Sequence, residues 1–104
     1  MVIEDLERYA TEHNVPIMQK DGITFLTDYI KEHKNIKNIL EIGCAIGYSS
    51  ICMALVRDDI YVTTIERDRE RYLKAIENVK VFHLEDRITI LFQDALDVSL
   101  KEQY

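Results

Sequence analysis

The segment Ile39–Ser50 reads ILEIGCAIGYSS, and it decides the fold of this chain. A short apolar run ends at Glu41 and Ile42, and Gly43 and Gly47 then bracket a small loop before a helical pattern begins. Glycine allows a tight turn and a close approach of the backbone to a ligand, and the following helix offers free N–H groups. We therefore predict a strand, a tight turn and a helix that together hold a nucleotide-like cofactor.

Composition limits the class of protein. The 104 residues suffice for one domain or a piece of one, and 47% hydrophobic with 31% charged residues is typical of a globular chain. The formal charge of −6 argues against a broad basic face for nucleic-acid backbones. The N-terminus lacks a signal-peptide pattern and no apolar run could span a bilayer, so we expect a cytoplasmic protein with no membrane association. The two cysteines lack metal-site spacing, so we expect no structural metal.

The apolar periodicity changes along the chain. Helical spacing predicts a first helix that ends before Pro16 and a second that opens near Asp21. Strands are predicted at 38–42, 61–66 and 88–92, with helices at about 47–57 and 68–82 between them. The first strand is nearly all apolar, which predicts cover on both of its faces. The alternation indicates an α/β fold, namely a Rossmann-like doubly wound parallel sheet, incomplete at three strands, in residues 36–104 after two N-terminal helices in 1–35.

Polar residues end all three predicted strands. They are Glu41 with the Gly43 loop, Glu66, and Gln93 with Asp94. Because ligands of parallel sheets lie beyond the carboxyl ends of the strands, these segments converge on one site. Glu66 suits the hydroxyls of a ribose and would repel a 2′-phosphate, although a solvated glutamate at a strand end remains an alternative.

The glycine pattern narrows the choice of cofactor. Dinucleotide folds use Gly-x-Gly-x-x-Gly to rest a pyrophosphate on the helix, but this loop has only Gly43 and Gly47. It also lacks the Gly-Lys-Ser/Thr ending of a phosphate-binding P-loop. A less anionic nucleoside ligand is favoured.

The motifs together resemble a known family. The segment 40–49 is similar to motif I of the S-adenosylmethionine-dependent O-methyltransferases of the catechol and caffeoyl-CoA type, especially their small bacterial members. Residues 65–68 resemble the ribose-binding segment of that family, residues 93–96 its adenine-side motif, and residues 16–18 the segment that closes over the cofactor. The resemblance covers essentially the whole chain.

The resemblance implies S-adenosyl-L-methionine as the cofactor and assigns a role to seven residues. Glu41 and Gly43 would face the amino-acid end of the cofactor, and Ser49 would bind the carboxylate of that end. Glu66 would hold the ribose, and Asp94 and Ala95 would contact the adenine. Met18 would pack nearby. The chain departs from the family pattern at Cys44, where threonine is frequent, and at Gln93, where glycine is usual.

The resemblance also implies that the chain is the cofactor-binding N-terminal part of a single methyltransferase domain spanning residues 1–104. In the family, the metal-ligating aspartate and the acceptor pocket lie in later segments, so we assign no catalytic and no metal-binding residue. Mg²⁺ is expected only in the full-length enzyme, which would methylate a hydroxyl of a small molecule, such as a catechol or a phenylpropanoid thioester. Hydroxylated wobble uridine in tRNA is the alternative acceptor. The fragment alone is expected to be inactive or nearly so.

Two other classes stay open from the residues alone. One is a fragment of a nicotinamide-dependent oxidoreductase, and the other is a non-catalytic α/β association module. In the family's strand order, the strand at 39–42 lies beside a later strand, so it would form an unpaired apolar edge in this chain. We therefore expect a homo-oligomer that forms through this edge or through uncovered helical faces.

Overall fold

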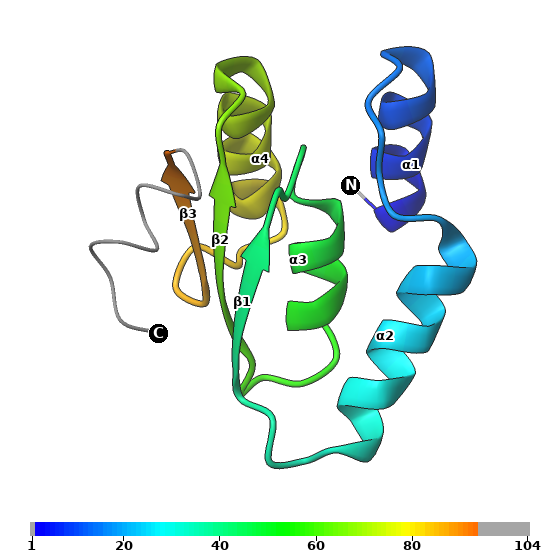
Figure 1. Cartoon of the computed structure of the whole chain (residues 1–104), viewed down its shortest axis with the longest axis vertical. Helices are drawn as coiled ribbons and strands as arrows, with labels where there is room; N and C mark the ends of the chain where they lie inside the picture. The colour runs from blue at the N-terminus through cyan, green and yellow to red at the C-terminus, as the bar shows by residue number, and fades with distance from the viewer. Residues whose placement is uncertain (1, 94–104) are drawn as a thin grey trace.

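In the computed structural model, which describes residues 2–93, two helices precede a β-α-β-α-β unit (Figure 1). The elements are α1 (Ile3–Glu12), α2 (Lys20–Glu32), β1 (Asn38–Ile42), α3 (Tyr48–Ala54), β2 (Tyr61–Glu66), α4 (Arg69–Val81) and β3 (Ile88–Phe92). The predicted fold class and the order of elements are confirmed. Within these residues, no helix has the length and apolarity that crossing a membrane requires.

The three strands form one parallel sheet in the order β1-β2-β3. Leu40 pairs with Thr63, and Thr63 pairs with Thr89 in turn, so side chains in register share a face across the sheet. The central strand β2 is the most buried of the three. As expected, β1 lies at an edge of the sheet in the described part of the chain.

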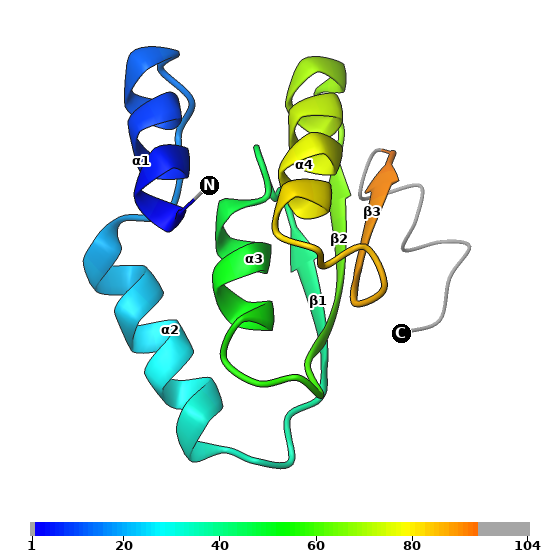
Figure 2. The same cartoon turned by 180° about the vertical axis from the view of Figure 1, so that it is seen from behind.

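Helices cover one face of this sheet. Seen from behind, α3 and α4 lie in front of the strands, and α1 and α2 stand beside α3 (Figure 2). The core fills the space between them. Its fully buried members come from the helices and the strands alike and include Leu6, Ile30, Ile51, Val62 and Ala75.

Among residues 2–93, no helix covers the β1 part of the opposite face of the sheet, which corrects the prediction of a first strand covered on both sides. Leu40 and Ile42 are 44% and 61% exposed, and Tyr61 beside them is 51% exposed. The reason is that both crossover helices pack on the other face, where Val62 is buried. The apolar sequence of β1 therefore predicted the strand correctly, but the described residues bury only one of its two faces.

Arg87 closes the end of the sheet where the strands begin. One guanidinium nitrogen, Nη1, donates to the carbonyl oxygens of Ala54 at 2.9 Å, Arg57 at 2.8 Å and Ile60 at 3.0 Å. These carbonyls belong to the end of α3 and the turn that follows it. A single side chain thus satisfies the polar groups of the connection between α3 and β2.

We expect Arg87→Leu to lower the free energy of unfolding by about 2 kcal/mol, because it removes the donor of three backbone carbonyls in a partly buried turn. Arg69→Leu is the matched control, since Arg69 is an exposed arginine at the start of α4 and its loss should cost less than about 0.5 kcal/mol. Urea unfolding followed by circular dichroism measures both. Equal losses in the two variants would contradict the role given to Arg87.

Candidate cofactor-binding site

The glycine loop between β1 and α3 alternates into the left-handed region of the backbone. The φ angles are +80° at Gly43, +52° at Ala45 and +87° at Gly47. Two backbone hydrogen bonds fix the loop, from Gly43 N–H to the carbonyl of Ile65 at 2.7 Å and from Gly47 N–H to that of Cys44 at 2.8 Å. The glycines adopt this conformation without strain, whereas Ala45 does so at a cost of about 1 kcal/mol. Contacts elsewhere must therefore hold Ala45 in place.

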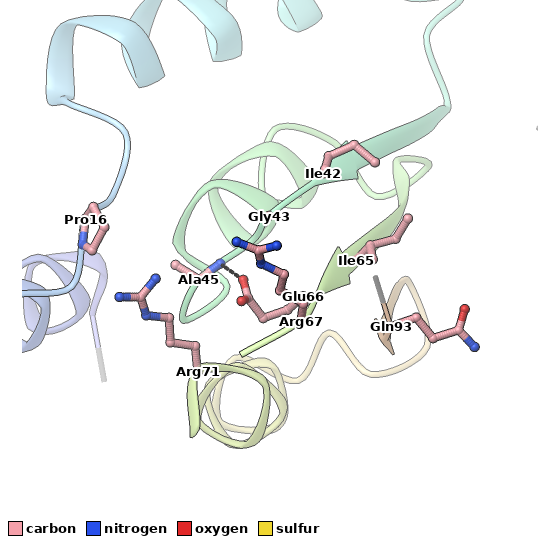
Figure 3. Close-up of a pocket in the computed structure, with 9 residues that line it drawn as sticks. All are labelled: Pro16, Ile42, Gly43, Ala45, Ile65, Glu66, Arg67, Arg71 and Gln93. Carbon is pink, nitrogen blue, oxygen red and sulfur yellow. Dashed lines mark hydrogen bonds between the residues drawn. The ribbon is translucent and has the colours of Figure 1, made fainter. Parts of the chain in front are cut away.

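Glu66, the last residue of β2, supplies one such contact. Its Oε1 accepts the backbone N–H of Ala45 at 2.8 Å (Figure 3). Its Oε2 accepts the backbone N–H of Asp68 at 2.9 Å. The side chain is only 6% exposed. Asp68 is the N-cap of α4, where its Oδ1 accepts the N–H of Arg71 at 3.0 Å, which confirms the predicted start of this helix. One carboxylate thus ties the loop, the end of β2 and the start of α4 together.

Glu41 anchors the other side of the loop. Its carboxylate accepts hydrogen bonds from the hydroxyls of Ser49 and Ser50 in the first turn of α3, and from Thr64 Oγ1 at 3.0 Å. These bonds hold α3 against the sheet. They also mean that the Ser49 hydroxyl donates its proton to Glu41, so the role predicted for Ser49 on a ligand carboxylate stays a prediction.

Helix α4 contacts the loop through Asn78 and Ala75. Asn78, which is fully buried, donates from Nδ2 to the carbonyl of Ile46 at 2.8 Å. A Cβ atom at Gly47 would lie 3.5 Å from the Cβ of Ala75, which is in ordinary van der Waals contact. Gly47 is therefore needed for its φ angle more than for space.

Two hollows meet along the loop at the carboxyl ends of the strands, with volumes of about 400 Å³ and 370 Å³. Both are lined by the same four residues, Pro16, Ile42, Gly43 and Ala45. We call the pair the loop trough. Figure 3 shows the half that contains Glu66.

Five of the seven predicted site residues line this trough. Glu66 lies in one half, Gly43 lies in both, and the other half contains Met18, Glu41 and Ser49. The remaining two, Asp94 and Ala95, lie outside the described residues. Among residues 2–93, no three side chains of His, Cys, Asp or Glu gather closely enough to hold a metal ion.

Among the lining residues to which the sequence analysis gave no role, three stand out for their charge or backbone conformation: Ala45, Arg67 and Arg71. The two arginines were open to prediction, because Arg67 follows Glu66 directly and Arg71 lies in the first turns of the helix that begins just after this strand end. Nothing in the sequence marks Ala45, since alanine is not a residue that favours a positive φ angle.

The thiols of Cys44 and Cys52 and the phenol of Tyr48 have raised pKa values, so all three are protonated at neutral pH. Burial raises the pKa of Cys44 to about 12 and that of Cys52 to about 11. Burial, together with a 2.5 Å hydrogen bond from its hydroxyl to Glu7 Oε2, also raises the pKa of Tyr48. These three side chains are therefore not present as thiolate or phenolate nucleophiles at neutral pH, and Cys44 acts as a small packing residue.

We expect Gly43→Ala to destabilise the protein by about 1–2 kcal/mol, because a side chain at φ +80° is strained even though no atom lies within 4 Å of the added Cβ. Gly22→Ala in α2 is the matched control. Its added Cβ would meet only the flexible Met18 side chain, at 3.3 Å, and alanine favours a helix, so stability should stay equal or rise by up to about 1 kcal/mol. Thermal and urea unfolding test the pair, and a stable Gly43→Ala variant would show that the loop does not depend on this angle.

Comparison with known proteins agrees with this geometry. The O-methyltransferase family profile matches residues 1–103. A structure from Staphylococcus aureus, provisionally assigned as a caffeoyl-CoA O-methyltransferase, is 40% identical with a TM-score of 0.88 over 94% of this chain and 46% of that chain. An O-methyltransferase from Bacillus cereus, solved in complex with S-adenosylhomocysteine, is 27% identical with a TM-score of 0.81 over 98% of this chain and 49% of that chain.

Among curated proteins, a provisionally assigned caffeoyl-CoA O-methyltransferase of Arabidopsis thaliana is 30% identical over 87 residues, which cover 83% of this chain and 36% of that protein. The chain spans about half the length of the solved relatives and about a third of this curated one. The family match, the parallel sheet and the glycine loop with an acidic residue at the end of β2 all agree, and the chain belongs to the O-methyltransferase family.

Proposed function

We propose that this chain is the cofactor-binding part of an S-adenosylmethionine-dependent O-methyltransferase and that the loop trough holds the cofactor. The observation that carries the proposal is the trough itself. It brings the glycine loop, Glu66 at the end of β2 and Met18 from the α1–α2 connection together around two hollows that share four lining residues. The relative from Bacillus cereus, which was solved with S-adenosylhomocysteine, supports this choice of ligand.

Glu66 suits the ribose for a reason beyond its position. Each of its carboxylate oxygens accepts one backbone N–H and keeps further acceptor capacity. The same two bonds fix the carboxylate before a ligand arrives, so little side-chain entropy is lost on binding. A ribose with two free hydroxyls could then donate one hydrogen bond to each oxygen.

The amino-acid end of the cofactor would lie in the other half of the trough. Glu41 places negative charge there, which favours the ammonium group of the ligand, and Met18 adds an apolar surface that is 42% exposed. Ser49 remains the proposed contact for the ligand carboxylate, and Asp94 and Ala95 remain the proposed contacts for the adenine.

The bound cofactor supplies an electrophilic methyl group for transfer to an acceptor hydroxyl. The residues of this chain bind and orient the cofactor, which is a positioning task. Mg²⁺ remains a proposal for the full-length enzyme, and residues 2–93 contain no set of donors that would hold it by themselves. Residues 1–104 would form one part of a single methyltransferase domain, placed in the reducing cytoplasm.

For the full-length enzyme we propose a phenolic acceptor. The names of two of them refer to caffeoyl-CoA, which supports a phenolic hydroxyl as the acceptor. Hydroxylated wobble uridine in tRNA remains the alternative, and the charge of −6 weakly disfavours it. The family match favours methyl transfer over a nicotinamide-dependent oxidoreductase or a non-catalytic association module.

Isothermal titration of the chain with S-adenosylhomocysteine tests the proposal. We expect binding, and we expect Glu66→Gln to weaken it about tenfold because a charge-assisted hydrogen bond to the ribose is lost. Glu85→Gln is the control, since Glu85 is exposed in the turn before β3 and should leave the affinity unchanged. Equal affinity of the unsubstituted chain and of Glu66→Gln for S-adenosylhomocysteine would contradict the ribose assignment.

A second ligand pair separates ribose binding from loop stability. Adenosine should bind the parent more tightly than 2′-deoxyadenosine, and this difference should shrink in Glu66→Gln. A merely structural role for Glu66 would weaken both ligands by the same factor.

We also propose that the open face and edge of β1 recruit a second copy of this chain. A hollow of about 400 Å³ lies there among Asn38, Leu40 and Tyr61, and an apolar edge strand is a template for pairing. Sedimentation velocity should show mass above the monomer at high concentration, and Leu40→Lys should shift it toward the monomer. Leu73→Lys on α4, where the leucine is 52% exposed, should change nothing. A clean monomer at high concentration would contradict this partner.

A further inference from the structure

Two arginines border the part of the loop trough that contains Glu66. Arg67 follows Glu66 directly, and Arg71 extends from the first turns of α4 toward Ala45 (Figure 3). Arg67 is exposed and Arg71 is half-buried. Neither takes part in an ion pair within the described residues, although the whole chain carries 19 acidic side chains.

The position of these cations runs against the helix dipole. Arg67, Arg69 and Arg71 gather at the N-terminal end of α4, where the partial charge of the helix is positive and acidic residues are favoured. Like α1, which has Glu4 and Asp5 in its first turn, α4 has acidic residues at its start, namely Asp68 at the N-cap and Glu70, but it adds the three arginines to them. A local cost of this kind is expected where a side chain serves a ligand.

The lining of the trough separates the three arginines by role. Arg67 and Arg71 line the trough, whereas Arg69 between them does not. Arg67 comes just before Asp68, the N-cap of α4, and Arg71 stands in the first turns of the helix, so the end of β2 and the helix each contribute one arginine to the trough. Arg69 is therefore a built-in control of equal charge at the same helix end.

We propose that Arg67 and Arg71 form an anion subsite beside the ribose position, which takes a phosphate ester on the 2′ or 3′ oxygen of an adenine nucleotide. The subsite rests on the proposed placement of the ribose against Glu66. Arginine is suited to this ligand because its planar fork binds phosphate through two parallel hydrogen bonds. Glu66 alone would repel such a phosphate, but Arg67 and Arg71, which line the same hollow, bring two positive charges against its single negative charge.

The consequence is competition at the cofactor site. A phosphorylated adenosine would occupy the ribose position and add charge-assisted hydrogen bonds that S-adenosylmethionine cannot make. Nucleotides of this class would then inhibit cofactor binding. Their affinity should fall as salt is added, because the subsite is open to solvent and its charges are screened.

Titration calorimetry of the full chain with adenosine, adenosine 2′-monophosphate and adenosine 3′-monophosphate tests the subsite. We expect at least one of the phosphates to raise affinity about tenfold over adenosine at low salt. The gain should disappear in the double variant Arg67→Gln/Arg71→Gln and persist in Arg69→Gln. Thermal unfolding of each variant checks that the fold is intact.

Three results would overturn the subsite. The first is that neither phosphate binds more tightly than adenosine, the second is that Arg69→Gln loses the gain as fully as the double variant, and the third is that no adenine ligand binds. Titration with S-adenosylhomocysteine separates failure of the subsite from failure of the proposed function. Binding of S-adenosylhomocysteine without any gain from phosphate removes the subsite alone, whereas phosphate-dependent nucleotide binding without S-adenosylhomocysteine binding removes the methyltransferase cofactor assignment alone.

Discussion

The hydrogen bond from the Ala45 N–H to Glu66 Oε1, at 2.8 Å, is the contact on which the site depends. Ala45 sits at a φ angle of +52°, which an alanine does not adopt without compensation. The bond supplies that compensation from the end of β2, and the second oxygen of Glu66 holds the start of α4. Loop, strand and helix therefore share one anchor, and a charge that would be costly to bury alone is satisfied by two backbone amides.

A second carboxylate repeats this arrangement on the other side of the loop. Glu41 accepts hydrogen bonds from Ser49, Ser50 and Thr64, so both acidic residues of the trough have polar partners before any ligand binds. Groups that are held in this way are preorganised, which lowers the entropy lost on binding. Asn78 contrasts with them. Its Nδ2 holds the loop, but its buried Oδ1 has no hydrogen-bond partner among residues 2–93.

Among the described residues, the two faces of β1 and β2 differ in how far their apolar side chains are buried. On one face, α3 and α4 bury Val62 and its neighbours; on the other, Leu40 and Ile42 are largely exposed. The trough lies at the carboxyl ends of the strands, beyond this open face, and its loop is anchored from the covered side by α4. The proposed cofactor site and the proposed surface for a second copy therefore involve separate residues.

The sequence by itself determined the α/β order, the three strand ranges and the site edge where Glu41, Gly43 and Glu66 meet. It could do so because β-branched and apolar runs, glycine spacing and strand-end acids are local patterns that parallel topology brings together. The tertiary structure alone decided that Ala45 takes a left-handed angle, that Ser49 donates to Glu41 and that one face of β1 is exposed. It also decided that Arg71 faces the trough while Arg69 does not. Each of these depends on which segments lie next to one another in space, and such contacts between distant residues leave no periodic signal in the chain.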